Sequence, residues 1–359
     1  MTAAAAIPVT VLTGFLGAGK TTLLARLLAR PELAGAAVLI NEVGEIALDH
    51  HLVREVRGDV VVLGSGCVCC TVSGDLVRAL ADLADAVARG ELPAFDRVLL
   101  ETTGVADPAG VLATLVTHPA VAGRFRPAAV VTAVDAVLGS ATLDRQREAV
   151  KQAALADRLV LTKCDAAAPE VIDALAARLR TINPAAPQVR AIGGDVATDV
   201  LLAPASGSEA GDDELPGWLA AAAAAPDRDG HGCPPGCGHD HDHGHAGVHA
   251  SHDGVSTIAV AFREPVRLGP LGMWLSIMTQ MHGESLLRIK GLVAVAGEPA
   301  PMVVHCVQHV IYPARALPAW PDDDHRTRLV FIARGLAAST LTSLRRSLAE
   351  TLGQDADAI

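Results

Sequence analysis

Aromatic residues, long apolar runs and positive charge are all scarce in this sequence. Phe, Trp and Tyr make up 3% of the 359 residues, so the chain lacks the aromatic platforms on which single-stranded nucleic acids stack. No run reaches the roughly 18–20 apolar residues of a membrane-spanning helix. A formal net charge of −11 opposes attraction to phosphate backbones and anionic lipids. The composition therefore predicts neither nucleic-acid nor membrane partners.

The residues at the start of the sequence do not favour a secretory signal. The first residues, "MTAAAAIPVTVLTGF", are apolar but have no basic segment in front of the apolar run, as a signal peptide would. We therefore expect a cytoplasmic protein. In that reducing compartment, the seven cysteines are more often metal ligands or redox groups than disulfides.

What is abundant is a repeated alternation of β-branched runs with Ala- and Leu-rich segments. The expected strands are residues 7–13, 36–41, 59–63, 96–102, 128–135 and 157–163. Strands separated by helix-length segments are typical of an α/β domain with a mostly parallel, doubly wound sheet.

A change of composition divides the chain. Residues 231–254 are dense in Gly, Pro, His and Asp and cannot bury enough apolar surface to order themselves. Regular patterning resumes at 255–262, followed by an expected helix at 267–281, strands at 286–296, 301–311 and 328–333, and a helix at 338–352. We predict an α/β domain (1–220), a flexible His-rich linker (221–254) and a smaller α+β domain (255–359).

The segment "GFLGAGKTT" fits the P-loop pattern G-x-x-x-x-G-K-[ST] from Gly14 to Thr21, between an expected strand and an expected helix. Backbone N–H groups of such a loop surround phosphates at a helix N-terminus. Lys20 is expected to reach the β and γ phosphates, and the Thr21 hydroxyl to bind Mg²⁺. The predicted nucleotide-binding residues are Gly14, Gly17, Ala18, Gly19, Lys20, Thr21 and Thr22.

Two further strand ends carry motifs that fit a P-loop enzyme. "LLETTG" places Glu101 where a carboxylate can hold Mg²⁺, and Gly104 where an N–H can sense the γ phosphate; the alternative is a merely solvated carboxylate. "VLTKCD" offers Thr162, Lys163 and Asp165, the [NT]-K-x-D pattern of GTPases. Asp165 can accept hydrogen bonds from N1–H and the 2-amino group of guanine, which adenine cannot supply.

Three cysteines lie within four positions after another expected strand. Cys67, Cys69 and Cys70 should project from the sheet edge where doubly wound folds bind ligands. Thiolates suit Zn²⁺, Co²⁺ or Cu(I), and a fourth ligand would complete a tetrahedral zinc site. Buried inert thiols are the alternative. "NEVGE" follows the second strand and offers Glu42 and Glu45 for a switch or a metal.

The linker holds seven of the fourteen histidines. Imidazoles at this density bind transition metals without fixed geometry, so we expect a loading or buffering segment that includes His239, His241, His243 and His245. A solvated linker is the alternative.

Taken together, "GFLGAGKTT", "NEVGE", "CVCC", "ETTGVADP", "TKCD", the His-rich stretch, "LLRIKGLVAVAGEP" and "VQHVIYPA" resemble the CobW-like P-loop GTPases, relatives of the nickel chaperones for urease and hydrogenase. The resemblance implies a metal-responsive GTPase that delivers Zn²⁺ or, in some branches, Co²⁺ for cobalamin synthesis. It also implies that the C-x-C-C thiols bind the metal near the nucleotide, with Glu45 and His118 as co-ligands. Two departures are Gly64-Ser65-Gly66 before the cysteines and Thr162 in place of the commoner Asn.

The predicted function is therefore hydrolysis of GTP to GDP with Mg²⁺, coupled to delivery of Zn²⁺ (or Co²⁺) to a client metalloprotein. The catalytic residues would be Lys20, Glu42, Glu101 and Gly104. A passive zinc buffer with regulatory nucleotide binding and a P-loop kinase are the alternatives. The sequence leaves open which metal is physiological, which client receives it, which residue orients the attacking water, and whether the protein forms a homo-oligomer.

Overall fold

The computed structural model describes residues 6–40, 62–64, 72–203, 215, 217, 219–220, 248–250 and 253–358. The chain divides into two compact units, Met1–Ala177 with Ala186–Ala210, and Arg178–Ala185 with Gly211–Ile359. The predicted domain limits stay a prediction, since most of the expected linker lies outside the described residues. No helix in the described part of the chain is both long and apolar enough to span a bilayer.

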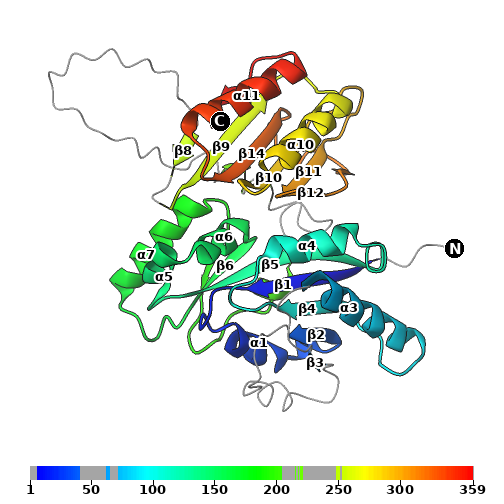
Figure 1. Ribbon diagram of the computed structural model, residues 1–359, viewed down its shortest axis with the longest axis vertical. Helices are drawn as coiled ribbons and strands as arrows, with labels where there is room; N and C mark the ends of the chain where they lie inside the picture. Colours follow the sequence, from blue (N-terminus) through cyan, green and yellow to red (C-terminus); the bar gives the residue numbers. More distant parts are fainter. Residues whose placement is uncertain are drawn as a thin grey trace. The chain divides into compact units, whose positions relative to one another are not determined.

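Seven strands form the sheet of the first unit (Figure 1). They are β1 (Ile7–Thr13), β2 (Ala36–Ile40), β3 (Val62–Gly64), β4 (Arg97–Glu101), β5 (Phe125–Asp135), β6 (Arg158–Thr162) and β7 (Gln188–Arg190). Their order is β3-β2-β4-β1-β5-β6-β7, and every neighbouring pair is parallel. The predicted doubly wound α/β fold is thus confirmed.

Helices cover both faces of this sheet. They are α1 (Lys20–Leu28), α3 (Val72–Ala88), α4 (Pro108–Thr117), α5 (Gly139–Arg145), α6 (Arg147–Leu155), α7 (Pro169–Ile182) and α8 (Asp199–Leu202), with a 3-10 turn η1 (Pro31–Leu33). Figure 1 shows α3, α4 and α6 on one side and α1 on the other. Because both faces are buried, the strands consist of continuous apolar runs with little polar alternation.

The strand register brings the carboxyl ends of the central strands to one edge. Leu12 of β1 is opposite Glu101 of β4, and Glu101 is opposite Ile40 of β2. On the other side of β1, Asp135 of β5 is opposite Thr162 of β6. The loops that leave these strands therefore start side by side, as the doubly wound fold requires of a ligand site.

The second unit contains an antiparallel sheet with two helices packed on one face (Figure 1). Its elements are β8 (Val248–Ala250), β9 (Val255–Phe262), α10 (Leu268–His282), β10 (Leu286–Val293), β11 (Met302–Val307), β12 (Val310–Ile311), β13 (Arg315–Ala316), β14 (Thr327–Arg334), α11 (Ala338–Leu352) and β15 (Asp357–Ala358). The main order is β12-β11-β10-β14-β9-β15; β13 pairs with β11 and β8 with β9. This is the expected α+β arrangement.

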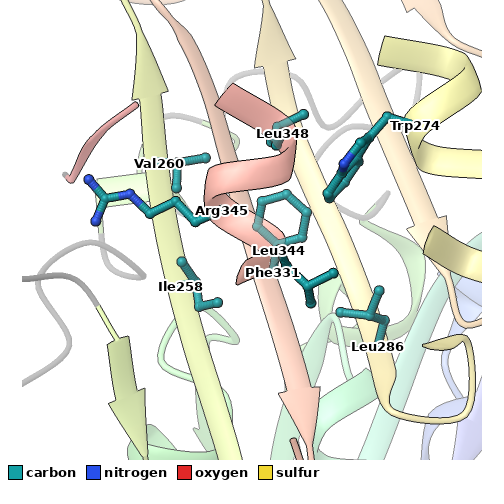
Figure 2. Close-up of a pocket in the computed structure, with 8 residues that line it drawn as sticks. All are labelled: Ile258, Val260, Trp274, Leu286, Phe331, Leu344, Arg345 and Leu348. Atoms are coloured by element: carbon teal, nitrogen blue, oxygen red, sulfur yellow. The ribbon is translucent and has the colours of Figure 1, made fainter. Parts of the chain in front are cut away.

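The core of the second unit contains an aromatic pair between α10 and β14. Trp274 and Phe331 meet edge to face with ring centroids 6.0 Å apart, a favoured aromatic geometry. Figure 2 shows these rings with Leu344 and Leu348 of α11 above β9 and β14. The cavity that they line has a volume of about 10 Å³, room for a single water. This cavity is a packing gap and too small to admit a cofactor.

Several strands differ from the sequence expectation. The short strands β8, β13 and β15 were not expected, and β8 lies within the segment that was expected to be a flexible linker. β7 was not expected, because three residues at a partly exposed edge give too short a pattern. The expected strand 301–311 is a hairpin of β11 and β12, in which Val307 is opposite Val310. No Gly, Pro or Asn marks the two-residue turn; Gln308 supplies its positive φ of 51° instead.

Candidate functional site

The loop between β1 and α1 has the backbone shape of a phosphate-binding loop. A Cβ on Gly14 would lie 2.3 Å from the carbonyl oxygen of Ala133 on β5, so only glycine permits this close approach. Gly19 precedes α1 with a φ of 83°, a left-handed conformation that glycine adopts without strain. The first turn of α1 has no acidic residue, and its N-terminus is therefore suited to an anion.

Lys20 and Thr21 begin α1 directly behind this loop. The Lys20 ammonium donates to the carbonyl oxygens of Gly14 (2.9 Å) and Phe15 (3.3 Å), so it lies across the loop. The Thr21 hydroxyl donates to Oε1 of Glu101 at 2.7 Å, and Glu101 is only 1% exposed. A hydroxyl and a carboxylate are the oxygen ligands that Mg²⁺ prefers, and this pair fits that ion.

The loop after β4 packs directly on the P-loop. A Cβ on Gly104 would meet the backbone nitrogen of Leu16 at 2.5 Å, so a side chain at 104 would push the two loops apart. Thr102 Oγ1 donates to Thr13 Oγ1 at 2.9 Å, which ties the root of this loop to the end of β1. The predicted residues Glu101 and Gly104 are therefore brought together with Thr21 and the P-loop.

The loop after β6 is fastened to the P-loop by two side chains. Thr162 Oγ1 donates to the carbonyl oxygen of Ala18 at 2.7 Å. The Lys163 ammonium donates to the carbonyl oxygen of Gly17 at 2.8 Å and to Asp135 Oδ2 at 2.6 Å. The phosphate loop and the predicted base-reading loop thus form one continuous surface.

Asp135 fixes Lys163 and is held in its ionised form. Its Oδ1 accepts hydrogen bonds from the backbone N–H groups of Val137 and Leu138. Burial raises the pKa of Asp135, but the Lys163 ammonium and the two backbone donors outweigh it, and the net pKa lies below its ordinary value. A permanent negative charge therefore faces the ammonium at neutral pH.

Asp165 lies beside a turn that follows β7. Its Oδ1 accepts a hydrogen bond from the backbone N–H of Gly193 at 3.1 Å. Ile192 is largely exposed in the same turn, and Gly193 and Gly194 both have positive φ. The turn supplies backbone donors and an apolar side chain next to the predicted base-reading carboxylate.

Sequence reasoning missed three parts of this edge. Asp135 ends a strand just as Glu101 does, and that shared position was the available signal. The turn 191–194 was missed together with β7. Gln152 of α6 is 1% exposed and donates to the loop after β4; no motif marks a single glutamine in a helix.

A cavity of about 260 Å³ adjoins the P-loop on the side of α5 and α6. Its walls include Phe15 and Leu16 of the P-loop, Asp135 and Lys163, and Gln152. Most of the residues that line it are apolar, and Asp135, Lys163 and Gln152 are among the polar ones. The edge therefore has room for a group beyond the phosphate loop itself.

Most of the predicted metal ligands lie outside the described residues: Glu45, Cys67, Cys69, Cys70, His239, His241, His243 and His245. The predicted catalytic residue Glu42 lies outside them too. His118 is described. It ends α4, is exposed, and accepts a hydrogen bond from the N–H of Ala120 through Nδ1. Because α4 starts near Gly104 and runs ten residues away, about 15 Å, the structure does not bring His118 to the P-loop.

Within the described ranges, no three or more His, Cys, Asp or Glu side chains are grouped closely enough to hold a metal ion. What the described edge does bring together is the P-loop, the loop after β4 and the loop after β6. The roles of the individual site residues stay predictions.

Comparison with known proteins gives the family context of this edge. Residues 8–190 match the family described as "CobW/HypB/UreG, nucleotide-binding domain", and residues 255–350 match "Cobalamin synthesis protein cobW C-terminal domain". The chain is 31% identical to the zinc chaperone YjiA of Escherichia coli K12 over 91% of this chain and 93% of that protein. It is 34% identical to zinc-regulated GTPase metalloprotein activator 1 of Schizosaccharomyces pombe, over 49% and 44% of the two chains.

Solved structures agree. The zinc-bound YjiA GTPase from E. coli matches 96% of this chain and 99% of its own with a TM-score of 0.66 and 25% identity. A zinc-bound triple mutant of YjiA matches with a TM-score of 0.67 and 26% identity. The resemblance predicted from the sequence motifs is confirmed. Since the two matches follow one another along both units, the chain belongs to the CobW/HypB/UreG family and carries a CobW-type C-terminal domain.

Proposed function

We propose that this chain hydrolyses GTP to GDP and phosphate and couples its nucleotide state to delivery of a transition metal to a client metalloprotein. The family and the names of the relatives, zinc chaperones and zinc-regulated GTPase activators, support a metal-binding GTPase chaperone with zinc as the first choice. The observation that carries the proposal is the joining of three motifs at one sheet edge by the contacts of Thr21, Thr162 and Lys163.

The chain's own groups account for guanine nucleotide binding. P-loop N–H groups and the Lys20 ammonium bind the β and γ phosphates, once the ammonium turns from the loop carbonyls. The stem of Lys163 covers the base, and Asp165 accepts its N1–H and 2-amino hydrogens. Thr21 and Glu101 would hold Mg²⁺, and the bound ion would supply positive charge next to the phosphates. Gly104 N–H contacts the γ phosphate, and Glu42 belongs to the switch that responds to it.

The proposed zinc site consists of Cys67, Cys69 and Cys70. Gly64 ends β3, two strands beyond β4 and level with Ile40. Cys67 follows Gly64 by three residues, so the chain keeps their Cα atoms within roughly 10 Å. This closeness along the chain supports a position of the thiols near the edge that holds the nucleotide motifs. Glu45 is a proposed co-ligand, and His239, His241, His243 and His245 a proposed loading segment. His118 is not proposed as a ligand, because it stands at the end of α4 that leads away from the P-loop.

Zinc titrations in three nucleotide states test the coupling. Zinc affinity should differ between the protein loaded with a non-hydrolysable GTP analogue, with GDP and with no nucleotide. Reciprocity then requires zinc to change the affinity for the GTP analogue by the same factor. Cobalt in a parallel series tests the second metal. Equal zinc affinities in all three states would contradict the proposed coupling. Absence of phosphate release from GTP would contradict the proposed hydrolysis.

A further inference from the structure

A buried glutamine on α6 holds the loop that follows β4. Gln152 Nε2 donates to the carbonyl oxygens of Gly104 (3.2 Å) and Ala106 (3.0 Å). The residue is 1% exposed, and a buried amide is costly unless it is hydrogen-bonded. Both amide hydrogens are thus used on this one loop.

The neighbouring residue makes a second attachment of the same helix. The Lys151 ammonium contacts Asp107 Oδ2 at 2.5 Å, while Asp107 Oδ1 accepts from the N–H of Ala109 and caps α4. Consecutive residues of α6 therefore hold the loop and the start of the next helix.

α6 is in turn fixed to the strand beside the P-loop. Thr132 Oγ1 donates to the carbonyl oxygen of Gln152 at 2.9 Å, and Thr132 is opposite Thr13 at the end of β1. On its other side, Gly104 lies against Leu16 of the P-loop. The position of Gly104 is thus set between the P-loop and Gln152.

We propose that Gln152 is a positioning residue of the GTPase, whose amide holds the Gly104–Ala106 turn in place for the γ phosphate. The proposal rests on the proposed function, because it assigns the Gly104 N–H to that phosphate. GDP has no γ phosphate, so the two hydrogen bonds of the Gln152 amide favour binding of GTP over GDP although Gln152 contacts neither nucleotide. It also makes α6 move with the nucleotide state.

The test compares Gln152→Met, which keeps the length of the side chain but cannot donate, with the parent. Affinities for GDP and for a non-hydrolysable GTP analogue are measured by titration. We expect the GTP analogue to bind about tenfold more weakly, GDP to stay within about twofold, and kcat for GTP to fall. If Gln152 had only a structural role, Gln152→Met would weaken the binding of both nucleotides equally. An unchanged ratio of GTP-analogue affinity to GDP affinity would therefore overturn the proposal.

A second glutamine of the same unit supplies the matched control. Gln188 on β7 also donates from its amide to a helix carbonyl, that of Ala176 on α7, at 3.0 Å. It thus binds α7 and not the loop after β4. Gln188→Met should leave the ratio of GTP-analogue to GDP affinity unchanged. If it changes this ratio as Gln152→Met does, the effect is not specific and the proposal fails.

Hydrogen exchange on the unaltered protein covers the case in which Gln152→Met does not fold. Amides of 104–106 and of α6 should both be more protected with the GTP analogue than with GDP. Protection of 104–106 alone would overturn the role of Gln152 and leave the proposed function standing. A parent protein that binds no guanine nucleotide would instead remove the proposed function.

Discussion

Lys163 adopts a left-handed backbone conformation, with a φ of 58°, that residues other than glycine rarely take. Its ammonium reaches both Gly17 O and Asp135 Oδ2 from that position. Such a conformation persists only where surrounding contacts fix it, and these are common at functional sites. At the scale of single residues, the site therefore depends on Asp135 as much as on the motif residues.

Replacing Asp135 by Asn tests this dependence. The amide lacks the negative charge that faces Lys163, so the side chain that we propose to cover the base is held less firmly. We expect affinity for GDP to fall about tenfold, because a hydrogen bond to a charged group contributes about 1.5–3 kcal/mol. Calorimetric titration measures it. Asp173→Asn, at an exposed ion pair with Arg190, is the control, and equal losses in both variants would contradict the prediction.

Asp324 in the second unit should make the stability of the fold depend on pH in the acidic range. Two hydrogen bonds from Arg326 oppose the effect of burial and lower the pKa of Asp324 to about 2 from 3.8. A lowered native pKa stabilises the fold above the unfolded value, and this contribution is lost as pH falls through the native value. Asp324→Asn should thus reduce stability above pH 4, by about 1 kcal/mol or less because the pair is partly exposed.

Urea unfolding from pH 6 to pH 2 measures this difference. The stability gap between the parent and Asp324→Asn should narrow as pH falls below 3.8 and be smallest near 2. Asp355→Asn, at an exposed position of the same unit, should show no such trend. A gap that is constant with pH would count against the ion pair.

At the scale of elements, the position of the P-loop is decided by its close contact with β5. Gly14 lies against Ala133 O, and Asp135 at the end of the same strand anchors Lys163. β5 is thus a shared support for the phosphate loop and the base-reading loop. Moving β5 would displace both binding loops together.

Gly14→Ala should therefore destabilise the first unit and abolish nucleotide binding. Its Cβ would lie 2.3 Å from Ala133 O, and its φ of 140° is unfavourable for alanine, so we expect a loss of about 2–4 kcal/mol. Gly110→Ala in α4, where nothing lies within 4 Å, should gain about 0.5–1 kcal/mol. Urea unfolding measures both, and a neutral Gly14→Ala would refute the contact.

At the scale of the whole molecule, the chain combines a nucleotide unit, an α+β unit and a stretch with half of its histidines. Thiolates can form a site of fixed geometry, whereas dense imidazoles bind several ions weakly. A chaperone and a passive zinc buffer therefore differ in which of these sets holds the tight zinc. A P-loop kinase differs from both because it transfers the γ phosphoryl group to an acceptor and does not release free phosphate.

Deletion of residues 231–252 distinguishes a chaperone function from a passive zinc buffer. We expect the shortened protein to keep one tight zinc site and its GTP turnover while losing several weakly held ions. Zinc stoichiometry by native mass spectrometry and phosphate release measure the two properties. Loss of almost all zinc would favour the buffer. Replacing Cys67, Cys69 and Cys70 by Ser in the full chain is the reciprocal variant, and it should lose the tight site alone.

Particular residues show how far sequence reasoning reached. Lys20, Glu101 and Asp165 could be predicted from the sequence. Each belongs to a short motif at or just after the end of a strand, and an apolar run predicts that strand. Gln152 could not, because its partners are carbonyl groups 46 and 48 positions away. Likewise, β7 is too short to show a pattern, and the turn at Gln308 has no glycine to mark it.

The sequence alone determined the fold class, the family and the phosphate-loop motif, because these follow from local patterns: buried strands, glycines at required dihedral angles and short motifs in a fixed order. Only the tertiary structure decided that Asp135 holds Lys163, that Gln152 holds Gly104, and that His118 ends α4 on the side away from the P-loop. These relations depend on which strands become neighbours and where helices end. Such distances are fixed by packing and are absent from any single stretch of the chain.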